Sequence, residues 1–213
     1  MSAGNPDGVY SVIPFGWDVR PDKPTRIRWH TGDPDTDPWQ WRLRVLNERD
    51  DVAYAKCFFR KGGYITKEWY PYFLAARRDG MDFGDAYADG LLSNFSKRIY
   101  TAIGEYGALA LDRIKSVCGF TREDKSKFEA ALVELQMKLF ITICGSYRKV
   151  SKTGEQYGWE TTVFSTAESF WGDEVFDAAA RLSSDEAFDA ILERIYALNP
   201  EADAAKARKF ILG

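Results

Sequence analysis

Histidine is nearly absent from this chain, since His30 is the only one among its 213 residues. No histidine or cysteine stands near it, so the usual ligand sets of transition-metal sites are excluded, and neither a metal nor another cofactor is expected. The three cysteines, Cys57, Cys118 and Cys144, lie far apart in apolar runs and form no Cys-x-x-Cys pair. We therefore expect them to be reduced thiols in the core.

Long apolar runs and nucleotide-binding motifs are also missing. The sequence has no run of about 18 apolar residues, and no apolar segment preceded by basic residues opens it, so neither a membrane span nor a secretory signal is predicted. It contains no P-loop, no Gly-x-Gly-x-x-Gly fingerprint and no Gly-x-Ser-x-Gly elbow. These absences favour a cytoplasmic protein with no membrane partner.

Charge of one sign is not in large excess either. The chain has 29 lysines and arginines against 32 aspartates and glutamates, a net charge of -3 at pH 7. This balance argues against strong nonspecific binding of nucleic acid. Residues 91–171, however, carry 11 basic and 9 acidic side chains, whereas residues 172–213 carry 5 and 9. The central stretch therefore has a weak bias toward an anionic partner.

The central stretch has the pattern of a winged helix-turn-helix. Apolar residues recur at helical spacing over residues 94–105 and 109–118, and a glycine follows each segment. A third helix of roughly 19 residues is predicted to begin at Thr121, a capping residue followed by acidic side chains. β-Branched runs at 141–144 and 161–164 predict a hairpin whose connecting loop is basic. Either Ser93 or Asn94 is expected to cap the first helix.

The segments before and after the central stretch lead to a predicted fold class of α+β, mainly α. Residues 9–41 contain five prolines and favour extended segments. A strand pair with a tight turn at residues 61–63 follows, and then a short aromatic helix up to Arg78 and a linker over residues 79–90. Amphipathic helices are predicted over residues 173–181, 185–198 and 202–212. We divide the chain into an aromatic N-terminal α/β segment (1–90), a winged helix-turn-helix (91–171) and a C-terminal helical extension packed on the rest (172–213).

Two groups of basic residues in the central stretch are candidates for nucleic-acid binding, because they can neutralise phosphates. The face of the third helix opposite its core face consists mostly of small or apolar residues. A helix that reads bases would need Arg, Asn or Gln on that face. That face is expected to be covered by the N-terminal segment or the C-terminal helices. The alternative for the basic residues is a solvated surface. The candidates are Arg122, Lys125 and Lys127 in the first turn of the third helix, and Arg148, Lys149 and Lys152 in the wing together with the polar aromatic residue Tyr147.

A candidate cleft is marked by Trp39-Gln40-Trp41, whose two tryptophans fall on one face of a strand or of a turn entering a helix. They are either core or cleft residues, or platforms on which a base stacks. Residues 33–38, just before them, place three aspartates at spacing two. Two prolines break an EF-hand pattern there, so a polar turn is expected in place of a cation site.

Several runs resemble the AlkZ-related proteins, relatives of the AlkZ-type winged-helix DNA glycosylases. The runs are Leu91-Leu92-Ser93, Lys97-Arg98-Ile99-Tyr100, Asp124-Lys125-Ser126-Lys127-Phe128 and Ala131-Leu132-Val133-Glu134-Leu135-Gln136-Met137. The resemblance implies a concave DNA-binding surface and hydrolysis of N-glycosidic bonds through a Gln-x-Gln or Gln-x-Asp motif that positions water. The nearest candidate here is Gln40-Trp41-Arg42, and Arg42 cannot accept a proton. No Gln-x-Gln or Gln-x-Asp occurs elsewhere.

The leading expectation is therefore a winged-helix DNA-binding protein of this type, with a role in DNA repair and no catalytic residues of its own. Two alternatives stay open. One is a divergent DNA glycosylase that uses a carboxylate of the 33–38 turn beside Gln40. The other is a winged-helix protein-interaction module, for which a protein partner or a homodimer replaces DNA.

Overall fold

The protein, described here as a computed structural model, is defined at residues 28, 31–33, 35–151 and 153–213. A five-stranded sheet has the strand order β2-β1-β4-β5-β3, and each neighbouring pair is antiparallel. The strands are β1 (Val52–Phe58), β2 (Lys61–Thr66), β3 (Ala108–Ala110), β4 (Ile141–Val150) and β5 (Gln156–Thr166). The helices are α1 (Pro38–Glu48), α2 (Tyr70–Arg78), α3 (Phe83–Ala88), α4 (Asn94–Tyr106), α5 (Leu111–Val117), α6 (Lys125–Met137), α7 (Ala167–Trp171), α8 (Asp173–Ala179), α9 (Ser184–Leu198) and α10 (Ala204–Leu212). The α+β, mainly helical class is confirmed.

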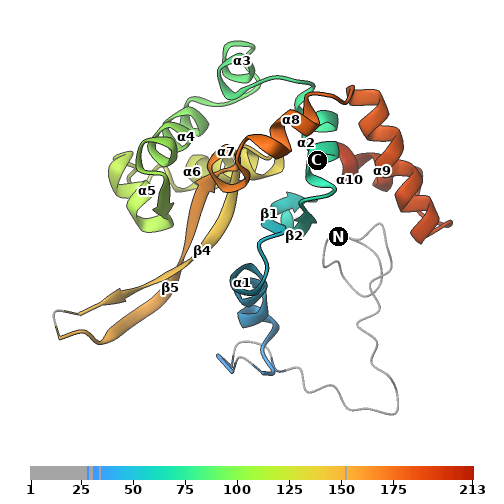
Figure 1. Cartoon of the computed structure of the whole chain (residues 1–213). Coiled ribbons are helices and arrows are strands. Elements are labelled where there is room, and N and C mark those ends of the chain that lie inside the picture. The colour runs from blue at the N-terminus through green and yellow to red at the C-terminus, as the bar shows by residue number, and fades with distance from the viewer. Residues whose placement is uncertain (1–27, 29–30, 34, 152) are drawn as a thin grey trace.

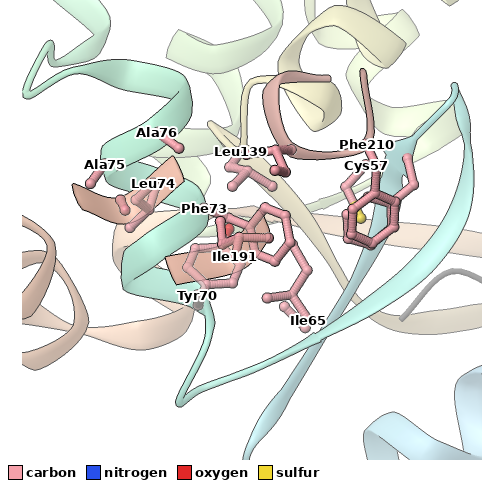
Figure 2. Packing of buried hydrophobic residues seen from close by; sticks show 14 of the residues in the cluster. Cys57, Ile65, Tyr70, Phe73, Leu74, Ala75, Ala76, Leu139, Ile191 and Phe210 are labelled. Carbon is pink, nitrogen blue, oxygen red and sulfur yellow. The ribbon is translucent and has the colours of Figure 1, made fainter. Parts of the chain in front are cut away.

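The first hydrophobic core joins the two ends of the chain. It combines β1, β2 and α2 with the helices that follow β5. Phe58 of β1 stacks on Phe210 of α10 with ring centroids 4.1 Å apart, and Phe73 of α2 meets both rings edge-on. Figure 2 shows side chains from α2, α9 and α10 converging on this cluster. Burying each such aromatic side chain contributes about 1.5–3 kcal/mol.

The second core is built by the central part of the chain, from α3 to β5. Phe140, which is 1% exposed, is met edge-on by Phe83 of α3 and by Tyr100 of α4, and these two rings stack on each other at 3.9 Å. Ile99 and Ile103 of α4 are fully buried in the same core. The apolar spacing that predicted this helix therefore corresponds to its buried face.

Arg77, near the end of α2, ties both cores together through backbone carbonyls. Its guanidinium donates four hydrogen bonds of 2.7–2.8 Å, to the carbonyl oxygens of Cys57, Met137, Phe210 and Ile211. Three of these carbonyls belong to the last turns of α6 and α10, where helices leave carbonyls unpaired. Burial around the guanidinium lowers the pKa of Arg77 to about 10, so it remains charged at neutral pH.

Arg78, the next residue, holds the turn after α6. It donates to the carbonyl oxygens of Lys138 and Leu139 and to the Glu168 carboxylate of α7 at 3.0 Å. Its guanidinium carbon lies 4.0 Å from the centre of the Phe140 ring. Leu139 has a left-handed backbone with φ of 61°, a conformation that costs a non-glycine residue about 1–2 kcal/mol. The hydrogen bond from Arg78 stabilises the turn in that conformation.

Helix α4 begins where the sequence predicts. Ser93 caps it by accepting a hydrogen bond from the Ser96 amide at 3.1 Å. The Glu134 carboxylate of α6 accepts in turn from the Ser96 hydroxyl, so the start of α4 is fixed to α6. Gly107, with φ of 77°, follows the end of the helix.

The turn between β1 and β2 differs from the prediction at residues 61–63. It is formed by Phe59 and Arg60, whose φ values are 49° and 61°, as in the turns that match the twist of a hairpin. Gly62 lies within β2, where an added Cβ would come 2.4 Å from the Tyr54 hydroxyl. Glycine at this position therefore makes room for the Tyr54 side chain.

The start of the predicted second helix is also wrong. Leu109 lies in strand β3 and pairs with Phe164 of β5, and α5 begins only at Leu111. The pairing partner lies more than 50 residues away in the sequence, so local periodicity could not distinguish a three-residue strand from a helical turn.

The predicted third helix is shorter than expected, because α6 spans 13 residues and begins at Lys125. Thr121 is not its cap. The Thr121 amide and hydroxyl both donate to the Asp124 carboxylate, at 2.9 and 3.0 Å, and these bonds close a turn before the helix. Arg122 consequently lies in this turn and not in a first helical turn.

The hairpin strands are longer than the β-branched runs, and Figure 1 shows β4 and β5 leaving the helices as a two-stranded ribbon. The ladder continues out to the pair Val150 and Gln156. Beyond it, the Ser151 amide donates to the Glu155 carbonyl at 2.8 Å. The predicted loop is thus mostly strand.

Three helices were not predicted. Residues 38–41, expected to be extended, open α1, which contacts β1 and β4. The predicted linker contains α3, capped by Asp82, and α7 follows β5 directly. The helices predicted after Trp171 are present, and Ser183 starts α9 with a complete capping box. The predicted extended segments within residues 1–27 lie outside the described residues. In the described part of the chain, no helix is long and apolar enough to cross a membrane.

Candidate nucleic-acid interface

A depression at the turn between α5 and α6 gathers three cationic side chains. Lys115 comes from α5, Arg122 from the connecting turn and Lys125 from the first position of α6. The cavity they line, together with Phe120, Thr121 and Phe128, measures about 450 Å³. The structure thus brings the predicted residues Arg122 and Lys125 together with Lys115, which nothing in the sequence singled out.

Aromatic rings hold further cations on the same surface. The Phe120 ring stacks on Phe95 of α4 at 4.9 Å, and the Arg98 guanidinium carbon lies 4.4 Å from the centre of Phe120. The predicted residue Lys127 places its ammonium 5.9 Å from the Phe95 ring. Such contacts stabilise an exposed cation by about 0.5–1 kcal/mol. Arg98 therefore joins the cationic surface, and its spacing of three from Phe95 along a helix is the only sequence signal for it.

Asp124 brings a negative charge into the same turn. Hydrogen bonds from the Thr121 amide and hydroxyl, together with nearby Lys127 and Arg98, hold the pKa of Asp124 below its usual range. Because this carboxylate bonds to Thr121, it makes no capping hydrogen bond to the amides of α6. The positive end of the α6 dipole is therefore not neutralised by a side-chain cap.

Lys125 also has an acidic neighbour on its own helix. Its ammonium lies 4.0 Å from the Glu129 carboxylate one turn later, and both side chains are largely exposed. An exposed pair of this kind contributes at most about 1 kcal/mol and is screened by salt. Lys125 can therefore exchange Glu129 for an incoming anion at little cost.

The ribbon carries the other predicted group. Tyr147 and Arg148 are exposed on β4, with Tyr147 at 42%, and Tyr157 on β5 is 54% exposed. Lys149 also belongs to β4, whereas Lys152 lies outside the described residues. The ribbon in Figure 1 extends away from α4, α5 and α6. The predicted cations therefore fall on two separate surfaces, the α5–α6 turn and the ribbon.

The second face of α6 is covered only at its C-terminal end. Ser126 and Ala130 are exposed, whereas Val133 and Met137 are partly buried. Val133 and Met137 line a cavity of about 350 Å³ whose other walls include the β1–β2 turn and the end of α10. The expectation that C-terminal helices cover this face therefore holds for its last two turns.

The aspartate turn before α1 is a polar turn. Asp33 and Asp35 are exposed, and Asp33 accepts hydrogen bonds from the Thr36 hydroxyl at 2.7 Å and the Asp35 amide at 3.0 Å, which lower the pKa of Asp33. Asp37 is fully buried and accepts from the Gly32 amide. Two of the three carboxylates are thus exposed, and the third, that of Asp37, is buried.

The candidate cleft residues Trp39, Gln40 and Trp41 lie in the first turn of α1, and the Gln40 side chain is partly buried. The Gln40 amide donates to the Asp37 carbonyl at 3.0 Å. Gln40 lies three positions after the buried Asp37, and the hydrogen bond between them joins backbone atoms, as at an ordinary helix start.

The cysteines are free thiols, with Cys57 buried and the other two partly buried. Burial raises the pKa of Cys57 to about 11 and also raises the pKa values of Cys118 and Cys144. A raised pKa keeps a thiol neutral and unreactive. Among the described residues, no group of three or more His, Cys, Asp or Glu side chains could hold a metal ion.

Residues 21–212 match the protein-family model described as AlkZ related. The match covers α1 to α10, including both cationic surfaces. Comparisons with curated proteins and with solved structures find no match.

Proposed function

The chain belongs to the AlkZ-related family, and from this premise we propose that it is a winged-helix protein that docks on the phosphate backbone of DNA without glycosylase chemistry of its own. The observation that carries the proposal is the set of cations at the α5–α6 turn, in a chain segment whose elements follow the order α4, β3, α5, α6, β4, β5 with β3 paired to β5. In a winged helix that order makes α5 and α6 the helix-turn-helix and the ribbon the wing.

The residues exposed on α6 favour phosphate contact over base reading. Beyond the first turn its exposed positions are Glu129 and Ala130, neither of which supplies the donors used to recognise bases in the major groove of DNA. Gln136, the amide side chain on this helix, is 1% exposed and bonds to the Lys56 amide and the Leu132 carbonyl. Arg98, Lys115, Arg122, Lys125 and Lys127 remain, and these suit phosphate oxygens.

The absence of the water-activating motif supports a non-catalytic role. The chain has three glutamines, Gln40, Gln136 and Gln156, and the residues two positions on are Arg42, Lys138 and Gly158. None of these three can act as the second amide or carboxylate beside an attacking water. We therefore expect no release of bases from alkylated DNA by the purified protein.

The test is binding of labelled single- and double-stranded DNA across a salt series. Each phosphate contact that is neutralised adds about -0.9 to the slope of log K against log salt for duplex DNA. We expect binding at low salt that weakens as salt rises, and a shallower slope when Arg148, Lys149 and Lys152 are all changed to alanine. A matched control changes Arg181, Arg194 and Lys209, exposed residues after α8, in α9 and in α10, and should leave the slope unchanged.

A protein-interaction module is the competing function. Failure to bind either form of DNA at low salt would refute docking on DNA. Release of a base from alkylated DNA would refute the absence of chemistry while leaving the docking surface intact.

A further inference from the structure

The α5–α6 depression concentrates positive charge in one concave surface. Lys115, Arg122 and Lys125 come from three consecutive pieces of chain and line one concavity of about 450 Å³. The depression therefore offers several cations to one ligand.

The depression is held in shape by contacts that involve no ligand. The Lys115 ammonium lies 5.1 Å from the ring of Phe128, which is 1% exposed and part of the second core. The two hydrogen bonds from Thr121 to Asp124 fix the turn that presents Arg122. The cations are thus carried on a preformed concave surface, which lowers the entropic cost of binding.

Phosphate groups differ in how well they match three converging cations. An internal phosphodiester carries one negative charge and has two free oxygens, and its neighbours extend along the strand in both directions. A terminal phosphomonoester carries a charge of about -1.5 to -2 at pH 7 and has three strong acceptor oxygens. The three cations therefore attract a terminal phosphate more strongly than an internal one.

We propose that the α5–α6 depression is a site for the terminal phosphate of a nucleic-acid end, with Lys115, Arg122 and Lys125 as its ligands. The inference rests on the proposed DNA docking and makes it more specific. A protein that holds a terminal phosphate binds strand ends in preference to continuous duplex. The ribbon then contacts the backbone without distinguishing one position from another.

The experiment uses a DNA hairpin with one blunt end, labelled in its loop, whose 5′ end carries either a phosphate or a hydroxyl. We expect the full-length protein to bind the phosphorylated hairpin about tenfold more tightly, the gain from one further charge-assisted hydrogen bond. The double variant Lys115→Gln/Arg122→Gln should bind both hairpins alike. The matched control Lys97→Gln/Arg148→Gln removes the same charge from exposed positions outside the depression and should keep the preference while weakening both complexes.

The pH dependence supplies an independent readout. The second pKa of a phosphomonoester is about 6, so the preference should shrink between pH 7.5 and pH 5 as the terminal phosphate gains a proton. The depression is lined by Lys115, Phe120, Thr121, Arg122, Lys125 and Phe128. Glu123, Asp124 and Glu129 add negative charge at the same turn and on α6. A change in their charge would also alter the preference, so Lys115→Gln/Arg122→Gln, which keeps all three acids, is measured over the same pH range and should show no preference at any pH.

Every other outcome of the experiment refutes a specific part of the proposal. Equal binding of the two hairpins refutes the terminal-phosphate site and leaves DNA docking standing. No binding of either hairpin at low salt refutes both. A preference that survives in Lys115→Gln/Arg122→Gln refutes the assignment to this depression.

Discussion

Arg77 provides a strong test of how the two cores are joined, because one guanidinium serves four backbone carbonyls from three elements. Replacing it with methionine keeps much of the side-chain length and its apolar stem and removes every donor. The expected result is a large loss of stability with the fold retained, since Arg77→Met opens no large cavity. Arg77→Lys keeps the charge but cannot reach carbonyls in four directions from one nitrogen.

The expected loss in the free energy of unfolding follows from the carbonyl oxygens that Arg77→Met leaves without a hydrogen-bond donor. A buried backbone oxygen without a partner costs about 1–3 kcal/mol. All four bonds are partly buried, and the carbonyls of Met137, Phe210 and Ile211 lie in the last turns of α6 and α10, where water can replace part of the guanidinium. We therefore count the full cost for about two of the four oxygens. Removing a charge from a buried position offsets part of it, and we expect a loss of about 3–4 kcal/mol for Arg77→Met and roughly half of that for Arg77→Lys.

Urea unfolding followed by tryptophan fluorescence measures this loss. With a denaturant slope of about 2 kcal/mol/M, the midpoint for Arg77→Met should fall by about 1.5–2 M. Arg181→Met, at an exposed position, is the control and should change the stability by less than about 0.5 kcal/mol. If Arg77→Met lost less than about 1 kcal/mol, water would satisfy all four carbonyls and Arg77 would not join the cores.

Three further predictions concern the first core and its hairpin. Gly62→Ala should destabilise the protein by about 1–3 kcal/mol, because its Cβ would lie 2.4 Å from the Tyr54 hydroxyl. Adding Tyr54→Phe should recover part of this loss. Fully additive losses of stability in urea unfolding would contradict that contact. Arg60→Gly should raise stability by roughly 0.5–1 kcal/mol by relieving its left-handed backbone, and a thermal midpoint that does not rise would count against this. Burial raises the pKa of Cys57 to about 11, so its thiol is protonated at pH 8 and should react with iodoacetamide only after unfolding; modification of Cys57 in the native protein, located by mass spectrometry, would show that the core opens.

The helices that the sequence predicted well are those whose signals are local. Helix α4 has a capping serine, an apolar stripe and a terminating glycine within 15 residues, and α9 has a complete capping box at Ser183. Each signal acts between residues three or four positions apart. Such helices are specified before any tertiary contact forms.

Features that depend on distant partners were missed. Strand β3 exists because it pairs with β5, and Gly62 stands inside β2 because the Tyr54 side chain leaves little room there for a Cβ. Neither cause is visible in the residues that adopt the structure. The prediction placed the β1–β2 turn at the glycines because glycine often marks a turn. Gly62 is instead required for the close approach of Tyr54, and not for a backbone conformation that only glycine adopts.

The residues of the candidate site likewise fall into those that local sequence could identify and those that it could not. Arg122 and Lys125 could be named as candidates because they are basic residues close to the predicted start of the third helix, although only Lys125 belongs to α6. Lys115 and Arg98 could not be named in this way, since their place beside the turn depends on how α4 and α5 pack around Phe120 and Phe128. The sequence shows which residues are charged but does not show which of them lie close together in the folded protein.

The division of the chain between the two cores has a consequence for synthesis on the ribosome. The second core takes its buried residues from 86–164, a continuous segment, whereas the first combines residues 53–76 with residues that extend to 211. Domains form as their residues emerge, N-terminal parts first, yet here β1, β2 and α2 are made early and must wait for α10. Until α10 has been made, Phe58 and Phe73 therefore lack the Phe210 ring that both of them contact in the folded protein.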